Sequence, residues 1–319
     1  MRFNVAAVPI PDRDRPYSVA ILGRVFGAIL TAMVTPFDAD LRVDEAAAAA
    51  LAHHLLEHGS DGLVMAGTTG EASTLTDEEK VSLFRLAVRE VGGGASVVAG
   101  TGSNDTAHSV HLTHLAAEAG ADACLVVTPY YNRPPRAGIV GHVAAIAEVG
   151  LPVLLYNIPS RSGLNLEPDL IAELAQIPHV VAVKQANPDL GELRAVVGGS
   201  GLAVYAGNDD MLLPVVELGG AGVISVASHL VGDEMAAIAA AAGRGDLGEA
   251  RRRDESLADL YAALFVTSSP ILIKAALEMT GLIPSGRLRL PLVEATPVQR
   301  DILRTVLERQ GILSRAPAS

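Results

Sequence analysis

Hydrophobic residues in this chain fall into short runs that alternate, from Gly27 onward, with alanine-rich stretches of helical length. The runs number eight and read AILTAMVT, GLVMAG, SVVAGTG, ACLVVTP, VLLYN, VVAVK, AVYAGN and GVISVAS. Between them, residues 45–58, 77–91, 105–119 and 209–218 show helical spacing, mostly after an acidic or small polar start. This alternation predicts repeated βα units around a parallel sheet.

The spacing of the eight units decides between two topologies. They follow one another over about 220 residues without a long insertion, which favours a closed (β/α)8 TIM barrel over a doubly wound open sheet. After about Asp246 the strand pattern stops, and helical patterns follow at 249–265, 270–279 and 297–309. We therefore expect a poorly ordered extension at 1–23, a barrel at 24–246 and a C-terminal helical region at 247–319.

Composition narrows the class of protein. Half of the 319 residues are hydrophobic, and the net charge of −12 argues against a nucleic-acid binder. The arginine run 251–253 is followed at once by two acidic residues, which predicts a solvated helix face. No apolar stretch reaches the roughly 18 residues of a membrane span, and the first residues lack the apolar core of a secretion signal. We therefore expect a cytoplasmic protein.

The single cysteine and the histidines suggest no special chemistry. Cys124 cannot form an internal disulfide, and its setting in ACLVVT predicts an inert, buried strand residue. His108, His111 and His114 recur at spacings of three, but no metalloprotease motif accompanies them, so solvated helix positions are expected rather than a metal site. The chain also lacks a Gly-x-Gly-x-x-Gly loop after a strand, which leaves a dinucleotide cofactor unsupported.

One lysine ends an apolar, β-branched run. The chain has three lysines, Lys80, Lys184 and Lys274, and Lys184 stands in VVAVKQAN. Burial at a strand end would lower the pKa of the ammonium toward that of a neutral, nucleophilic amine. The alternative is a lysine that extends into water or pairs with a carboxylate.

Other polar motifs follow the predicted strands, where a barrel of this kind carries its chemistry. They are GTTGE at 67–71, TPYYN at 128–132, YNIPSRSG at 156–163, GND at 207–209 and ISVAS at 224–228. Each has an ordinary interpretation: GTTGE as a helix-capping turn, the two tyrosines as packing residues, Arg161 as a surface side chain. Alternatively, the GTTGE turn binds an anion and Arg161 forks onto a carboxylate.

In this order, the motifs GTTGE, TPYYN, YNIPSRSG, VVAVKQAN, GND and GVISV resemble the dihydrodipicolinate synthase and N-acetylneuraminate lyase family of Schiff-base aldolases. The resemblance runs from about Gly27 to the C-terminus. It implies that Lys184 forms an imine with the C2 carbonyl of pyruvate. This imine then loses a methyl proton and becomes an enamine. No cofactor is implied beyond this covalent imine.

The resemblance also assigns roles to the matching residues. Catalytic roles fall to Lys184, to the proton-relay residues Tyr156 and Thr68, and to Tyr131, which would reach the site of a neighbouring subunit. Substrate-binding roles fall to Thr69, Gly207 and Ile224 for pyruvate, and to Arg161 for the carboxylate of aspartate-4-semialdehyde.

Arg161 favours the synthase form over the sialic-acid lyases, so the expected reaction condenses pyruvate with aspartate-4-semialdehyde, the first committed step toward diaminopimelate and lysine. The alternatives are a sister aldolase acting on a sugar acid or another 2-oxo acid, and a catalytically silent pyruvate-binding barrel. The family pattern implies a homotetramer built as a dimer of dimers, without nucleic-acid or membrane partners.

The sequence departs from the feedback-inhibited members of the family that bind lysine. Asn104 and Tyr130 match two of the expected contacts, but Lys80 stands where those members have a histidine, and His108 where they have a glutamate. Weak or absent inhibition by lysine is therefore expected.

Overall fold

The computed structural model describes residues 26–91 and 93–313, so the extension expected at 1–23 lies outside the described residues. Eight parallel strands close into a barrel in sequence order. They are β1 (Ile29–Ala32), β2 (Gly62–Met65), β3 (Ser96–Gly100), β4 (Ala123–Val127), β5 (Val153–Asn157), β6 (Val180–Gln185), β7 (Ala203–Ala206) and β8 (Gly222–Ser225). Because β1 pairs with both β2 and β8, the TIM barrel is confirmed and the open sheet is excluded.

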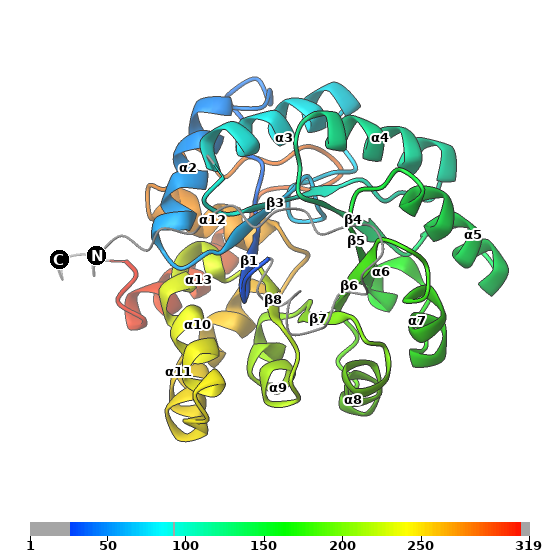
Figure 1. Cartoon of the computed structure of the whole chain (residues 1–319). Coiled ribbons are helices and arrows are strands. Elements are labelled where there is room, and N and C mark those ends of the chain that lie inside the picture. Colours follow the sequence, from blue (N-terminus) through cyan, green and yellow to red (C-terminus); the bar gives the residue numbers. More distant parts are fainter. Residues whose placement is uncertain (1–25, 92, 314–319) are drawn as a thin grey trace, which may run out of the picture.

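Helices surround this ring of strands (Figure 1). They are α2 (Glu45–Glu57), α3 (Asp77–Val91), α4 (Thr106–Glu118), α5 (Arg136–Ala147), α6 (Pro159–Ser162), α7 (Pro168–Leu174), α8 (Leu190–Gly199), α9 (Leu212–Glu217) and α10 (Ser228–Gly243). Asp44 and Asp105 cap α2 and α4 by accepting hydrogen bonds from backbone N–H groups of the first turn.

The helix expected at 209–218 is divided. A 3₁₀ turn, η1 (Asp209–Met211), precedes α9. Pro214 has no N–H, so a continuous α-helix from Asp209 would lose an interior hydrogen bond there. With the α-helix beginning at Leu212, Pro214 falls in the first turn, where its missing N–H needs no partner.

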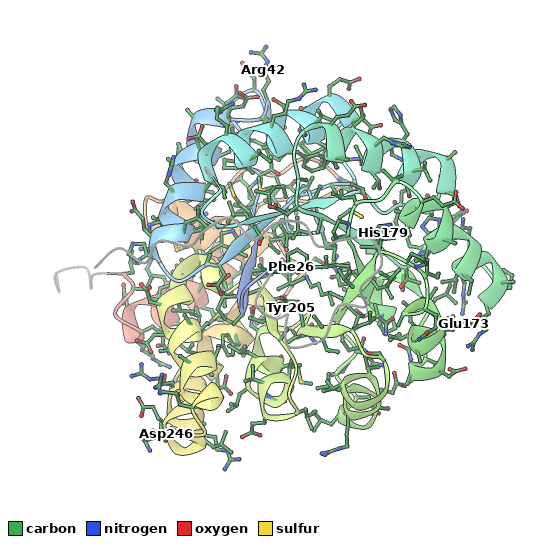
Figure 2. All side chains as sticks on the ribbon, in the orientation of Figure 1. Phe26, Arg42, Glu173, His179, Tyr205 and Asp246 are labelled. Carbon is green, nitrogen blue, oxygen red and sulfur yellow. The ribbon has the colours of Figure 1, made fainter. Side chains whose placement is uncertain are left out.

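The core has two layers, because alternate side chains of each strand face the barrel interior and the helices. Inside the barrel, Leu30, Val64, Val98 and Tyr205 are fully buried. Figure 2 shows Phe26 and Tyr205 near the middle of the ring, and the Tyr205 hydroxyl donates to the carbonyl of Gly27 at 2.9 Å. The amino-terminal end of the barrel is therefore filled by side chains, which leaves the opposite end for a site.

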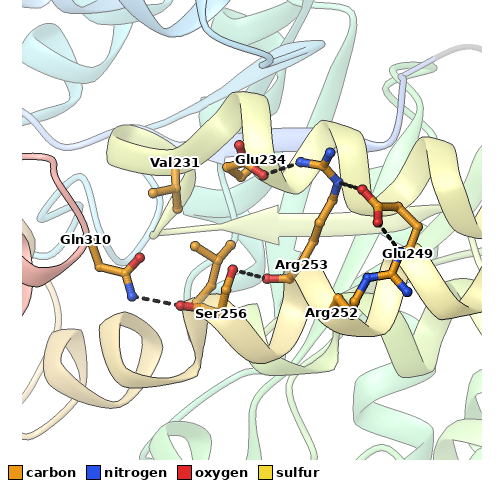
Figure 3. Close-up of a pocket in the computed structure, with 8 residues that line it drawn as sticks. Val231, Glu234, Glu249, Arg252, Arg253, Ser256 and Gln310 are labelled. Atoms are coloured by element: carbon orange, nitrogen blue, oxygen red, sulfur yellow. Dashed lines mark hydrogen bonds and ion pairs between the residues drawn. The ribbon is translucent and has the colours of Figure 1, made fainter.

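Three further helices follow α10: α11 (Leu247–Leu264), α12 (Ile271–Met279) and α13 (Pro297–Arg309). Arginines of the run 251–253 form ion pairs with Glu217, Glu234 and Glu249. Figure 3 shows that the charged residues lining the hollow between α10 and α11 pair with one another. The run is thus a surface feature of the fold, as the sequence predicted.

Within the described part of the chain, no helix combines the length and apolarity that crossing a bilayer requires.

Candidate functional site

Lys184 lies at the carboxyl end of β6, between Tyr156 of β5 and Tyr205 of β7 in the strand register. Its side chain does not extend into solvent, since the residue is only 5% exposed. Among the described residues, no carboxylate forms an ion pair with it, whereas Lys80 and Lys274 both have one. Lys184 is therefore a buried ammonium without a direct counterion.

This environment changes the acidity of the Lys184 ammonium. Burial lowers its pKa to about 8, Asp209 opposes the shift by its negative charge, and Arg161 adds to it by its positive charge. The Nζ atom lies 4.5 Å from the centroid of the Tyr156 ring. About a tenth of the amine is thus unprotonated at pH 7, far more than for an ordinary lysine, and the neutral amine is the nucleophilic form.

Tyr156 and Thr68 are brought together beside this lysine. Tyr156 is buried on β5, and burial raises the pKa of its phenol to about 12, although the charge of Arg161 and a hydrogen bond with Thr68 work in the opposite direction. The phenol is therefore protonated at neutral pH, and the Thr68 side chain lies close enough to affect its pKa. A connected phenol and hydroxyl can relay a proton next to a reacting amine.

The GTTGE loop follows β2 and has a closely fixed backbone. The N–H of Glu71 donates to the carbonyl of Thr68 at 3.1 Å, and the N–H of Ala72 donates to that of Gly67 at 3.2 Å. A Cβ atom at Gly100 would lie 2.2 Å from the carbonyl oxygen of Ala66, so glycine at this position lets the loop pack against β3. Thr69 is buried within the loop.

Arg161 lies in the last turn of the short helix α6 and is exposed at the rim. Its Nη2 donates to the carbonyl of Ser269 at 3.3 Å. The guanidinium lies close enough to influence the pKa values of both Lys184 and Tyr156. The structure thus places a cation next to the buried amine, with its fork partly exposed to incoming anions.

Gly207 and Ile224, to which the resemblance assigned pyruvate binding, lie directly after β7 and on β8. The N–H of Gly207 donates to the carbonyl of Gln185 at 2.7 Å, and a Cβ at this position would lie 2.5 Å from that of Ala186. Only glycine therefore allows the ends of β6 and β7 to approach this closely. Ile224 is fully buried on β8.

Asp209 was not among the site residues that we selected from the sequence. It is buried, and its carboxylate accepts hydrogen bonds from the hydroxyl of Ser225 at 2.6 Å and from the N–H groups of Val226 and Ala227 at 3.0 and 3.1 Å. Burial raises its pKa, while these bonds and the charge of Lys184 lower it. Its signal in the sequence was the acidic residue of GND, directly after a buried strand.

Tyr131 is not brought into this site. The residue is 90% exposed, in the loop after β4, with a left-handed backbone at φ 72°. The loop is anchored by Asn132, whose Nδ2 donates to the carbonyl of Asn104 at 2.8 Å. If Tyr131 is catalytic, it must therefore act in the site of another subunit.

The cysteine and the histidines lie elsewhere. Cys124 is buried on β4, as predicted, and burial raises the pKa of its thiol to about 12, so it is unreactive. His108 hydrogen-bonds to Asp77 at 2.8 Å. Among the described residues, no group of three or more histidine, cysteine or acidic side chains is arranged to hold a metal ion.

Comparisons with known proteins match nearly the whole chain. The model of the dihydrodipicolinate synthetase family matches residues 25–310. A 4-hydroxy-tetrahydrodipicolinate synthase of Heliobacterium modesticaldum is 47% identical over 290 residues, which cover 90% of this chain and 96% of that protein. The relatives therefore share both the barrel and the C-terminal helices.

Solved structures agree with the sequence comparison. The dihydrodipicolinate synthase of Cyanidioschyzon merolae with lysine bound aligns with a TM-score of 0.88 and 42% identity, over 90% of this chain and 99% of that chain. The chloride-inhibited dihydrodipicolinate synthase of Acinetobacter baumannii, complexed with pyruvate, gives 0.87 and 38% over the same shares.

Proposed function

The chain belongs to the dihydrodipicolinate synthetase family, and from this premise we propose that it condenses pyruvate with aspartate-4-semialdehyde to 4-hydroxy-tetrahydrodipicolinate. This lyase reaction leads toward diaminopimelate and lysine. One observation carries the proposal: Lys184 presents a buried amine with a pKa lowered to about 8 at the carboxyl end of a barrel strand.

The reaction begins when the neutral amine of Lys184 attacks C2 of pyruvate. A C–N bond forms, the carbonyl oxygen takes up a proton, and the carbinolamine loses water to give the imine. The pair of Tyr156 and Thr68 is placed to carry these protons. The protonated imine is the electron sink that allows a methyl proton to leave, so the enamine forms without another cofactor.

Substrate binding follows from the groups around the amine. Thr69 and the lining residues Gly207 and Ile224 hold pyruvate, whose carboxylate accepts hydrogen bonds from the GTTGE loop. Arg161 binds the carboxylate of the aldehyde, because a guanidinium can donate two parallel hydrogen bonds to it. The enamine then attacks the aldehyde carbon, and the aldehyde oxygen takes up a proton as the new C–C bond forms. The amino group of the semialdehyde next attacks the imine carbon, which closes the ring and breaks the C–N bond to Lys184, so the lysine leaves as the free amine.

The acceptor aldehyde is tested by steady-state assays with pyruvate and a panel that contains aspartate-4-semialdehyde and N-acetylmannosamine. We expect turnover with the semialdehyde. Turnover with the sugar alone would show the sister aldolase, and pyruvate binding without turnover of any aldehyde would show the silent barrel.

Arg161→Ala separates the two substrates within that assay. The variant should raise KM for aspartate-4-semialdehyde by about tenfold or more, since a lost charge-assisted contact costs about 1.5–3 kcal/mol. Pyruvate should still form its adduct with Lys184. Arg133→Ala, in the exposed loop after β4, is the control. An unchanged KM in the Arg161 variant would contradict the role of Arg161 in binding aspartate-4-semialdehyde and would favour the sister aldolase.

Assembly and location belong to the same proposal. A homotetramer built as a dimer of dimers would give the exposed Tyr131 a neighbouring site to enter. A cytoplasmic location suits a chain whose only cysteine is a buried, unpaired thiol.

A further inference from the structure

Glu71, the last residue of the GTTGE loop, forms an ion pair with a residue distant in the sequence. Its Oε1 lies 2.7 Å from Nζ of Lys274, on α12, and both side chains are 0% exposed. The Nζ atom of Lys274 also donates to the carbonyl of Thr35 at 2.9 Å and lies 4.2 Å from the centroid of the Phe37 ring. The C-terminal region thus places a buried cation directly beneath the loop.

The other carboxylate oxygen of Glu71 is occupied as well. Its Oε2 accepts a hydrogen bond from the backbone N–H of Arg289 at 3.0 Å. The side chain of Arg289 pairs with Glu79 and lies 4.5 Å from the ring of Phe37. Glu71 is therefore held from two directions, by Lys274 on α12 and by the backbone of Arg289 in the segment that follows α12.

The backbone of the loop depends on these contacts. Glu71 has a left-handed backbone at φ 57°, a conformation that persists in a non-glycine residue only where its surroundings hold it. The hydroxyl of Thr35 donates to the carbonyl of Gly70 at 2.7 Å. Lys274 consequently reaches the loop by two routes, directly at Glu71 and through Thr35 at Gly70.

These contacts lie next to the residues that hold pyruvate in the proposed reaction. The N–H of Glu71 donates to the carbonyl of Thr68, so a rotation at Glu71 would move the Thr68–Thr69 peptide. We propose that Glu71 is a positioning residue for pyruvate: its buried pair with Lys274 fixes the Thr68–Thr69 segment, and α12 thereby controls binding of the pyruvate carboxylate. The inference rests on the proposed function.

Stability alone does not account for a pair of this kind. A buried ion pair gains little net free energy over an apolar pair of similar volume, because both charges lose their hydration. Its directional hydrogen bonds, in contrast, fix the position of each partner. Removing both charges therefore separates the two roles, since stability can recover while the loop position does not.

The test compares Glu71→Gln, Lys274→Met and the double variant. Two quantities are measured: the melting temperature, and the pyruvate concentration that half-saturates borohydride trapping at Lys184. We expect each single variant to melt at lower temperature, because an unpaired partner stays buried. The double variant should regain most of the melting temperature but still need about tenfold more pyruvate, as expected for a displaced binding group.

Arg300→Met is the matched control, because it breaks the 2.7 Å pair with Glu278 between α12 and α13 and leaves the loop untouched. Its half-saturating pyruvate concentration should stay within about twofold of that of the parent. A double variant that regains both its melting temperature and the parent's pyruvate affinity would overturn the positioning role. If the single variants do not fold, the double variant still decides.

The parent protein separates this inference from the proposed function. If the parent forms no trapped adduct on Lys184, the proposed function fails. If the parent forms the adduct and the double variant forms it at the same pyruvate concentration, only the positioning role of Glu71 fails.

Discussion

At the scale of single residues, the three lysines show how surroundings decide the chemistry of one side chain. Lys80 pairs with Asp77 on α3, and Lys274 pairs with Glu71 beneath the loop. Lys184 is buried without such a partner, and burial lowers its pKa to about 8. The same side chain is thus a cation with a counterion in two places, and in the third it has the lowered pKa that the proposed nucleophile needs.

The pH dependence of imine formation follows from this pKa. Below about pH 8 the amine is mostly protonated, so the rate of borohydride trapping should fall about tenfold per pH unit and should level off above it. Asp209 raises the pKa of Lys184 by its charge, so Asp209→Asn should shift the midpoint to lower pH.

The control for the removal of one negative charge is Asp210→Asn, because Asp210 is the next residue in the chain and its side chain is exposed. Trapping rates at low pyruvate, followed from about pH 6 to about pH 10, give the midpoints directly. A midpoint that stays in place in Asp209→Asn, or moves to higher pH, would contradict the charge argument.

Residue types that follow a buried strand could be found in the sequence, but their partners could not. Lys184, Tyr156 and Arg161 were selected because they follow predicted strands, where a barrel carries its chemistry, and because they match motifs of the family. The hydrogen bonds of Asp209 come from residues on β8 and beyond, and Lys274 meets Glu71 across 203 positions of sequence. Such contacts depend on how the barrel closes and on where α12 packs.

At the scale of elements, the helices α3 and α4 meet at a small charged cluster. The carboxylate of Asp77 lies 2.8 Å from Nε2 of His108 and 3.4 Å from Nζ of Lys80. Burial works to raise the pKa of Asp77, but the hydrogen bonds and charges of His108 and Lys80 outweigh it and lower the pKa. The only carboxylate of the cluster is therefore already engaged.

Inhibition by lysine should be weak for this reason. A lysine ligand would bring a further ammonium to a cluster where Lys80 and His108 already share Asp77, and like charges repel. We expect half-inhibition, in an assay saturated with pyruvate, only above about 1 mM lysine. The double variant Lys80→His, His108→Glu should bind lysine more tightly. Submillimolar inhibition of the parent would show that the charge argument is wrong.

Periodicity predicted the strands better than the helices. Each of the eight apolar runs coincides with an observed strand, with β6 extending one residue beyond its run to Gln185, because a strand buried on both faces needs a continuous apolar sequence. The prediction of a single helix at 209–218 was wrong, because the spacing of apolar residues carries no information about the missing N–H of Pro214. Helices α5, α6, α7, α8 and α10 were not singled out from the sequence.

At the scale of the whole molecule, the proposed dimer would allow the exposed Tyr131 to act in the site of a partner subunit. If Tyr131 acts in the site of a partner, each site takes its lysine from one subunit and its tyrosine from the other. Lys184→Arg and Tyr131→Phe then remove residues that different subunits contribute to one site. A mixed dimer of the two variants would contain one site with both an intact lysine and an intact tyrosine.

Mixing the two variants after reversible dissociation should therefore restore activity that neither has alone. Each variant dissociated and reassembled by itself is the control. Absence of restored activity in a mixture shown to contain mixed dimers would contradict the role of Tyr131. An active monomer in sedimentation at assay concentration would contradict it as well.

The central claim is that Lys184 carries pyruvate as an imine, and reduction of that imine tests it most directly. Incubation with pyruvate and borohydride should add one reduced pyruvyl group per chain, and peptide mapping should locate it on Lys184. Lys184→Arg should abolish the adduct, because a guanidinium remains protonated and cannot attack the carbonyl. An adduct on Lys80 or Lys274, or one that persists in Lys184→Arg, would contradict the account.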